Sequence, residues 1–260
     1  RGNTRFGSPP KAAPPCPASP ASILPQSRFR CWAASAPQRS RLRSKSSSKQ
    51  QAGQARAQMR QSFELECRDR SITFEWLSFD GDPVGTLYLA TETRDLIITG
   101  HDTAFYGETL EPLSAVLAKL LLLTPRPIIV CPDTDPKLGD VLIAYDGSIP
   151  AMRALQIFVM LALGIGRRIS VVAVDESQEI AARRAAAAAS YLHIHGYEAE
   201  ANPIASTLNP EQVIRAAVAD RGIETMVMGA YGHRGFREAL FGSTTTALAE
   251  NPPCALFLYH

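Results

Sequence analysis

Short hydrophobic runs alternate with amphipathic or alanine-rich stretches over the second half of the chain. Unbroken apolar runs of this length are typical of strands buried on both faces of a parallel sheet, and the stretches between them have helical spacing. The pattern predicts β-α alternation, with a first helix running to about Leu163 and a last helix from about Ser243 to Glu250. The predicted strand sequences are DVLIAYDGS, RISVVAVDES, YEAEANPIAS, ETMVMG and CALFLY.

Residues at the ends of these segments support the same boundaries. Ser148 is suited to cap a helix that has Pro150 in its first turn, and Asn209 precedes a helix that begins with Pro210. The stretch LGIGRR at residues 163–168 follows a helix and lacks the third glycine of a dinucleotide fingerprint, so it is interpreted as a helix C-cap and turn. No G-x4-GK[ST] loop occurs, which excludes the P-loop mechanism.

The first half carries a less complete set of elements. A helix is predicted from about Ala55, because Met59, Phe63 and Cys67 follow one another at a spacing of four residues. After it we predict a strand at ITFEWLSF, a short helix near Asp82-Pro83, a strand at DLIITG, a leucine-rich helix at 113–123 and a strand at PIIVCP.

The first 50 residues are rich in Pro, Ser and Arg and show no apolar periodicity, which predicts disorder. Residues 1–60 hold twelve basic residues and no acid, so the rest of the chain is acidic by about ten charges. A basic, acid-free leader is also typical of a transit peptide, and its charge favours nonspecific nucleic-acid contact. A third hypothesis is a wrong-frame translation of a missing β-α-β unit. The expected domains are 1–53, 54–136 and 137–260.

Composition excludes several classes of protein. The longest apolar candidate for a membrane span, 113–130, is interrupted by Lys119, Pro125 and Arg126, so no membrane association is expected. The five cysteines show no CxxC pair, which favours reduced thiols and a cytoplasmic location without zinc. His193 and His195 are two positions apart and would lie on different faces of a helix, so no metal site is predicted.

The stretch MGAYGHRGFREALFGSTT contains the candidate binding residues. Gly229 ends a predicted strand, Gly232 lies in the following loop, and Gly242-Ser243 opens a helix. Free N-H groups and the dipole at a helix start favour phosphate, and the hydroxyls of Ser243 and Thr244 add donors. Asp146 also follows a predicted strand, and the carboxyl ends of parallel strands share one edge. The two turns are therefore expected to converge on one crevice.

The spacing G-x2-G-x9-G-[ST] resembles that of the nucleotide-binding members of the universal stress protein family. The resemblance covers residues 139–260. It implies that Gly229, Gly232, Gly242, Ser243 and Thr244 hold the phosphates of ATP, with or without magnesium. It also implies that Asp146 contacts the nucleoside and that Val174 packs on adenine. The bland alternatives are a structural glycine loop and an ordinary Asp-Gly-Ser turn.

The resemblance further implies an α/β, Rossmann-like fold with an open parallel five-stranded sheet, helices on both faces, and two tandem copies. The first copy is incomplete and has no G-x2-G pair, so it is expected to bind no nucleotide. The copies are expected to pair through their last strands, within the chain or in a homodimer. The implied function is an ATP-binding stress-response or signalling module with an unknown partner and no specific nucleic acid. The alternatives are a nucleotide-free scaffold and a slow ATPase, and no catalytic residue is predicted.

Overall fold

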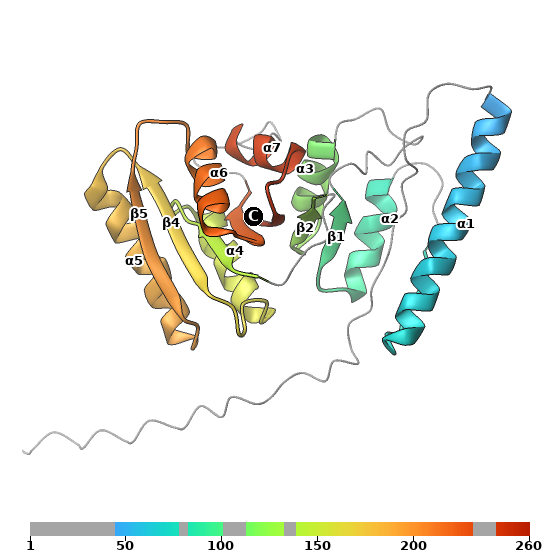
Figure 1. The fold of residues 1–260 in the computed structure, drawn as a ribbon, viewed down its shortest axis with the longest axis horizontal. Coiled ribbons are helices and arrows are strands. Elements are labelled where there is room, and N and C mark those ends of the chain that lie inside the picture. Colours follow the sequence, from blue (N-terminus) through green and yellow to red (C-terminus); the bar gives the residue numbers. More distant parts are fainter. Residues whose placement is uncertain (1–44, 78–82, 101–112, 133–138, 231–242) are drawn as a thin grey trace, which may run out of the picture.

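A computed structural model describes residues 45–77, 83–100, 113–132, 139–230 and 243–260 (Figure 1). Its strands are β1 (Ile97–Gly100), β2 (Ile128–Cys131), β3 (Val141–Ala144), β4 (Ile169–Asp175), β5 (Ala199–Ala205), β6 (Thr225–Gly229) and β7 (Ala255–Tyr259). They form one seven-stranded sheet in the order β1-β2-β7-β6-β3-β4-β5. Neighbouring strands are parallel except β2 and β7, which are antiparallel.

The described helices are α1 (Lys45–Asp69), α2 (Pro83–Ala90), α3 (Leu113–Leu123), α4 (Ile149–Met160), α5 (Gln178–Ile194), α6 (Pro210–Arg221) and α7 (Ser243–Glu250), and a 3-10 turn follows α2 at Thr91–Thr93. Two predicted caps are confirmed. The Ser148 hydroxyl accepts a hydrogen bond from the Ala151 N-H, and the Asn209 side chain accepts one from the Glu211 N-H. These caps satisfy backbone donors that a helix start leaves unpaired.

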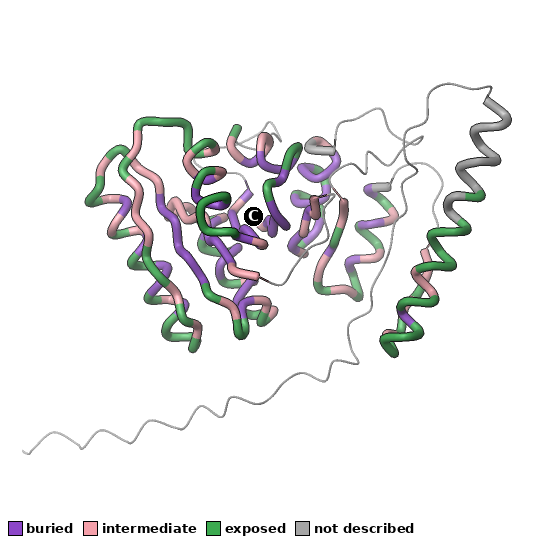
Figure 2. Tube along the Cα trace, viewed as in Figure 1, coloured by how far each residue is buried: buried purple, intermediate pink, exposed green. Residues whose placement is uncertain are grey.

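Alternate residues of the strands enter separate cores on the two faces of the sheet. Leu142, Met226 and Leu256 pack on one face with side chains of α3, α6 and α7. Phe257 and Val227 pack on the other face with side chains of α4 and α5. Figure 2 shows the buried residues gathered along the central strands. The predicted α/β fold with helices on both faces is confirmed.

Part of the chain's architecture occurs twice. The order α2-β1-α3-β2 repeats the order α6-β6-α7-β7, and we call residues 83–132 the first unit and residues 139–260 the second unit. The second unit contributes the expected five parallel strands, and the first unit contributes two. Antiparallel pairing of β2 with β7 joins the units, with Ile129 opposite Phe257. The structure thus shows the within-chain form of the predicted pairing between last strands.

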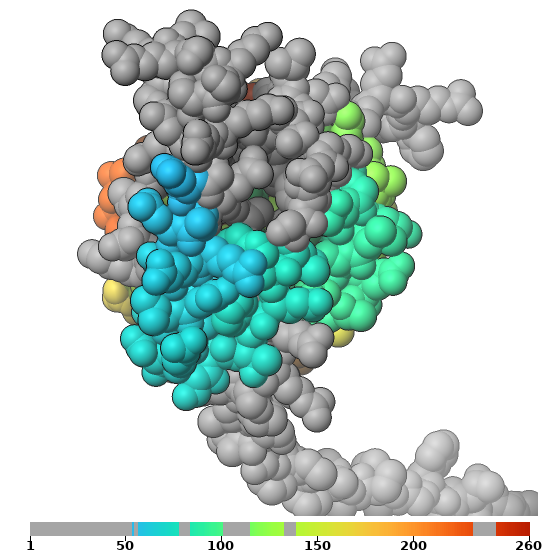
Figure 3. All heavy atoms as spheres, turned by 90° about the vertical axis from the view of Figure 1, so that its right-hand side faces the viewer, coloured from blue at the N-terminus to red at the C-terminus, as the bar shows by residue number. Residues whose placement is uncertain are grey.

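Two predictions for the N-terminal part are wrong. The segment ITFEWLSF does not form a strand: among its described residues only Phe74 makes an isolated bridge. The rings of Phe74 and Trp76 instead pack against Phe63 of α1, with centroids 5.5 and 6.4 Å away. The helix α1 also begins at Lys45, inside the range predicted to be disordered, because alanine, glutamine, lysine and arginine favour helix without apolar periodicity. Figure 3 shows the side of the molecule on which α1 and the first unit lie.

Candidate functional site

The strand order reverses between β3 and β6. From β3 the chain continues to β4 and then β5 on one side, whereas β6 and β7 lie on the other side. Ligands of open α/β sheets bind at such a reversal, beyond the carboxyl ends of the strands. Ala144 at the end of β3 pairs with Met228 in β6, so the turns at Asp146 and Gly229 leave the same edge of neighbouring strands. We call this edge the crevice.

The turn after β3 is fixed by its own side chains. A carboxylate oxygen of Asp146 accepts a hydrogen bond of 2.9 Å from the Ser148 N-H, and Gly147 has a φ of +77°. The Ser148 hydroxyl then accepts a bond of 3.2 Å from the Ala151 N-H in the first turn of α4. This turn orients Asp146 and starts α4, so the predicted turn chemistry of Asp-Gly-Ser is present at the crevice.

Backbone packing requires a glycine at position 229, whether or not Gly229 also contacts a ligand. A Cβ atom built on Gly229 would lie 2.4 Å from the Ala151 nitrogen and 2.5 Å from the Pro150 carbonyl carbon. The first turn of α4 therefore crosses directly over the end of β6. The close approach of the two backbones explains the glycine without reference to phosphate.

Three apolar side chains reach the ends of neighbouring strands on the α6–α7 face. Ala144, Val174 and Ile204 pack against the core there but are only partly buried, and Val174 pairs in register with Ile204. They form an apolar floor beside the crevice. The helix α7 starts with Ser243 exposed and Thr244 half-buried. Gly232, Gly242 and the loop between them lie outside the described residues.

Two residues at the crevice were not anticipated from the sequence. Asp175 ends β4, and one of its carboxylate oxygens lies 2.6 Å from a terminal nitrogen of Arg184 on α5. The Ser177 N-H donates to Asp175, and this bond together with Arg184 holds the pKa of the carboxyl below its ordinary value. Arg184 also lies against the turn after β3, with its Nε 3.4 Å from a Cβ built on Gly147.

The signal for Asp175 was present in the sequence as a repeated pattern. Asp146-Gly147-Ser148 and Asp175-Glu176-Ser177 both place an aspartate at a strand end, two residues before a serine. In both turns the aspartate accepts from the serine N-H at 2.9 Å, and the serine caps the next helix. Arg184 had no such signal, because its position over Gly147 depends on how α5 packs.

The described residues contain no group of three or more His, Cys, Asp or Glu side chains arranged to hold a metal ion. His193 hydrogen-bonds through Nε2 to the Ala199 carbonyl at 2.9 Å, and the His195 ring packs against Tyr191 with centroids 4.6 Å apart. Both histidines thus have structural contacts. Within the same part of the chain, no helix is long and apolar enough to cross a membrane.

Comparison with known proteins agrees with this geometry. Residues 138–260 match the model of the universal stress protein family. These residues belong to the universal stress protein family. The chain is also 28% identical over 155 residues to universal stress protein Slr1230 of Synechocystis sp., an alignment that covers 58% of this chain and 53% of that protein. The chain thus matches about half the length of this curated relative.

Solved structures extend the likeness in fold beyond the universal stress domain. A universal stress protein from Archaeoglobus fulgidus is similar with a TM-score of 0.62 and 20% identity, covering 81% of this chain and 77% of that chain. A protein of unknown function from Pseudomonas aeruginosa is similar with a TM-score of 0.53 and 17% identity, covering 78% and 77%. At these identities the likeness concerns the fold, and it includes residues N-terminal to the universal stress domain.

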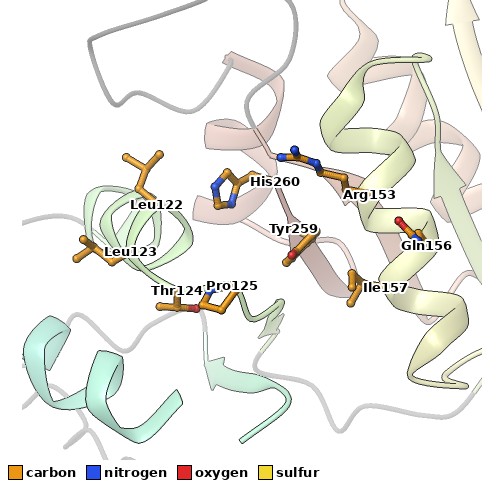
Figure 4. Close-up of a pocket in the computed structure, with 9 residues that line it drawn as sticks. All are labelled: Leu122, Leu123, Thr124, Pro125, Arg153, Gln156, Ile157, Tyr259 and His260. Atoms are coloured by element: carbon orange, nitrogen blue, oxygen red, sulfur yellow. The ribbon is translucent and has the colours of Figure 1, made fainter. Parts of the chain in front are cut away.

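A separate cavity lies away from the crevice. It has a volume of about 580 Å³ and is bordered by the end of α3, one flank of α4, and the end of β7 (Figure 4). Arg153 on α4 and His260 both line it, and burial together with the Arg153 charge lowers the pKa of His260. None of the predicted binding residues borders this cavity.

Proposed function

We propose that the second unit binds ATP at the crevice and acts as a nucleotide-responsive stress or signalling module. The observation that carries the proposal is the meeting of two features at the strand reversal. The Asp146 turn supplies a carboxylate at the end of β3, and the partly exposed Ala144, Val174 and Ile204 supply an apolar floor beside it. A nucleoside needs both kinds of surface.

Each part of the nucleotide has a matching group in this proposal. The base packs on the floor near Val174, and the ribose hydroxyls donate to the Asp146 carboxylate. The phosphates lie along Gly229, Gly232, Gly242, Ser243 and Thr244, where the free N-H groups of α7 favour negative charge. Magnesium bound with the phosphates would supply positive charge that offsets theirs.

Arg184 adds a cation at the nucleoside end. Arg184 forms an ion pair with Asp175, and its guanidinium lies against Gly147, next to Asp146 at the end of β3. Two neighbouring carboxylates would otherwise repel an anionic ligand. The pair therefore favours nucleotide over an uncharged nucleoside in our proposal.

The proposed activity is binding rather than catalysis. Phosphoryl transfer to water requires a group that orients the attacking water, and we assign that role to no residue. A slow ATPase and a nucleotide-free scaffold remain the alternative functions. A cytoplasmic location, a homodimer and a signalling partner belong to the same proposal.

The test is the nucleotide content of the purified full-length chain. Denaturation releases bound nucleotide for chromatography, and wild type is compared with Gly242→Val and with the control Gly85→Val. Gly85 lies on α2, and a Cβ there would meet nothing within 4 Å. ATP or ADP in wild type and the control, but not in Gly242→Val, is the expected result.

Two other outcomes decide between the alternatives. Wild type that carries no nucleotide and binds no added ATP would contradict the proposal and favour the scaffold. Phosphate release from added ATP that is lost in Gly242→Val would instead establish the slow ATPase.

A further inference from the structure

A second cavity lies at the amino ends of β3, β4 and β5, on the edge of the sheet opposite the crevice. Its volume is about 570 Å³. The first residues of these three strands, Val141, Ile169 and Ala199, pair in register and line it. The last turn of α5 adds His193, and the end of α6 adds Arg221. We call this space the amino-edge cavity, and none of the residues assigned to the nucleotide borders it.

Three polar side chains form a hydrogen-bond network at the amino-edge cavity. The two terminal nitrogens of Arg221 donate to the Ser170 hydroxyl at 3.1 Å and to the Asn202 side-chain oxygen at 3.0 Å. The Asn202 amide nitrogen donates to the same Ser170 hydroxyl at 3.0 Å. A guanidinium can only donate, so the Asn202 atom that faces it must be the oxygen. Arg221 therefore fixes the orientation of the Asn202 amide.

This network leaves the proton of the Ser170 hydroxyl without an acceptor in the protein. The oxygen accepts from both Asn202 and Arg221, so the proton points away from both of them. Among the described residues Ser170 donates to no other group, although its side chain is only 9% exposed. A buried donor without an acceptor is costly. Because Ser170 lines the amino-edge cavity, a ligand oxygen there could accept this hydrogen bond.

The cavity also brings together charges that do not neutralise one another. Arg221, Glu198 and Glu200 all line it. In the part of the chain that the structure describes, none of the three forms an ion pair. Glu200 pairs in register with Ser170, so the two side chains leave the same face of the sheet. One guanidinium and two carboxylates are thus available to a ligand in one space.

The other polar residues of the lining are already occupied. Arg168 forms an ion pair with Asp140, with 2.6 Å between a guanidinium nitrogen and a carboxylate oxygen. These two residues therefore add little net charge. The Nε2 atom of His193 is hydrogen-bonded to the Ala199 carbonyl. The polar groups left for a ligand are those of Ser170, Arg221 and the two glutamates.

The remaining lining is apolar. Val141, Ile169 and Ile223 are buried side chains that border the cavity. Tyr197 borders it too, and its hydroxyl donates to the Val159 carbonyl at 3.3 Å. The hydroxyl is thereby occupied, so Tyr197 contributes mainly the apolar surface of its ring. A few polar groups against an apolar wall are typical of small-molecule sites, and the volume lies in their usual range.

We propose that the amino-edge cavity binds a small zwitterion, namely an amino acid with an apolar side chain. Its carboxylate accepts from the Ser170 hydroxyl and from Arg221, and its ammonium group donates to Glu198 and Glu200. Its side chain lies on the apolar wall. This site is at the opposite edge of the sheet from the crevice, and the proposal does not depend on nucleotide binding.

Each charge of the ligand answers a separate feature of the cavity. An anion without an ammonium group would lie beside two carboxylates of like charge, with no cation of its own to offset them. A cation without a carboxylate would leave the Ser170 proton without an acceptor and would face the Arg221 guanidinium. Only a ligand that carries both charges matches the lining.

The test compares three compounds that share one phenyl group. L-Phenylalanine is the probe, 3-phenylpropanoate lacks its amino group, and 2-phenylethylamine lacks its carboxylate. Each is titrated into the full-length protein by isothermal titration calorimetry. Phenylalanine should bind saturably, and each of the other two compounds should bind at least about tenfold more weakly, because each loses its charge-assisted hydrogen bonds.

Substitutions then locate the site. Arg221→Gln should weaken phenylalanine binding about tenfold, and Ser170→Ala should weaken it by a smaller factor. The double variant Glu198→Gln/Glu200→Gln should weaken binding of phenylalanine without weakening that of 3-phenylpropanoate. Arg183→Gln is the control, because Arg183 is exposed on α5 and does not line the cavity. Circular dichroism checks that all variants retain the fold.

Three results would overturn the proposal. The first is the absence of saturable phenylalanine binding to wild type, and the second is equal affinity for the three compounds. Both are measured on the unchanged protein, so they decide the question even if a variant fails to fold. The third is a folded Arg221→Gln variant that binds phenylalanine as tightly as wild type does, which would place the ligand elsewhere.

Discussion

The helices and strands of the first unit follow the same order as the last four elements of the second unit, and the two sets differ in what covers them. In the second unit, Val227 and Phe257 are completely buried beneath α4. In the first unit, the corresponding Ile98 is 53% exposed and Ile129 is half-buried. The side chains are all strongly hydrophobic. Burial in this fold is therefore decided by the covering helix and not by the strand alone.

The largest difference between the units should appear when large side chains are removed from β7 and β2. Phe257→Ala should lower the free energy of unfolding by about 3–5 kcal/mol, because it empties a fully packed site. The Phe257 ring makes an edge contact with Phe158 at 5.8 Å between centroids, which the substitution also removes. Ile129→Ala should cost about 1–2 kcal/mol, because its site is already partly open. Urea denaturation measures both, and equal losses would contradict the comparison.

A smaller difference is expected at Gly229 and Gly100, which end the corresponding strands β6 and β1. Gly229→Ala forces a methyl group into the first turn of α4 and should cost about 2–3 kcal/mol through displacement of that helix. Gly100→Ala should cost less than Gly229→Ala, since no helix among the described residues packs on β1 as α4 packs on β6. A loss at Gly100 as large as that at Gly229 would mean that the chain itself already crosses this strand closely.

The smallest effect concerns the ion pair of Asp175 with Arg184, which has no counterpart in the described residues of the first unit. The pKa of Asp175 is lowered from 3.8 by the Ser177 N-H, with a further contribution from Arg184. A lowered folded-state pKa contributes stability above 3.8, and this contribution is lost as the pH falls through the folded-state value. Asp175→Asn should therefore lower the free energy of unfolding at neutral pH by less than Phe257→Ala or Gly229→Ala does.

The measurement is urea denaturation of wild type and Asp175→Asn at neutral pH and again well below 3.8. Because asparagine keeps an oxygen that accepts from the Ser177 N-H, the variant removes mainly the charge. The difference between the two proteins should disappear at acidic pH. A difference that persists there would show that the substitution disturbs packing instead.

Much of the second unit was predictable because the signals are local. Apolar runs, the caps at Ser148 and Asn209, and Gly229 at a strand end are each encoded within a few neighbouring residues, and the structure bears out the helices and strands that they predict. The resemblance to the universal stress protein family rested on glycine spacing in the same way. Local patterns also identified α2, α3, β1 and β2 in the first unit.

The errors arose where distant contacts outweigh local pattern. ITFEWLSF alternates as a strand does, yet Phe74 and Trp76 pack on Phe63 of α1 instead of joining the sheet. Asp175 carried a readable pattern, but its partner Arg184 reaches the crevice from the second turn of α5. No spacing within one segment specifies which side chain a neighbouring helix will place there.

The sequence by itself determined the alternation of strands and helices, their caps, and the positions of the turns at Asp146 and Gly229, because each depends on backbone preferences of adjacent residues. Only the tertiary structure decided that Asp146 and Gly229 share one edge, that β2 pairs antiparallel with β7, and that Ile98 stays exposed while Val227 is buried. Those outcomes depend on strand order and on which helix packs on which face, and both are set by contacts between residues far apart in the chain.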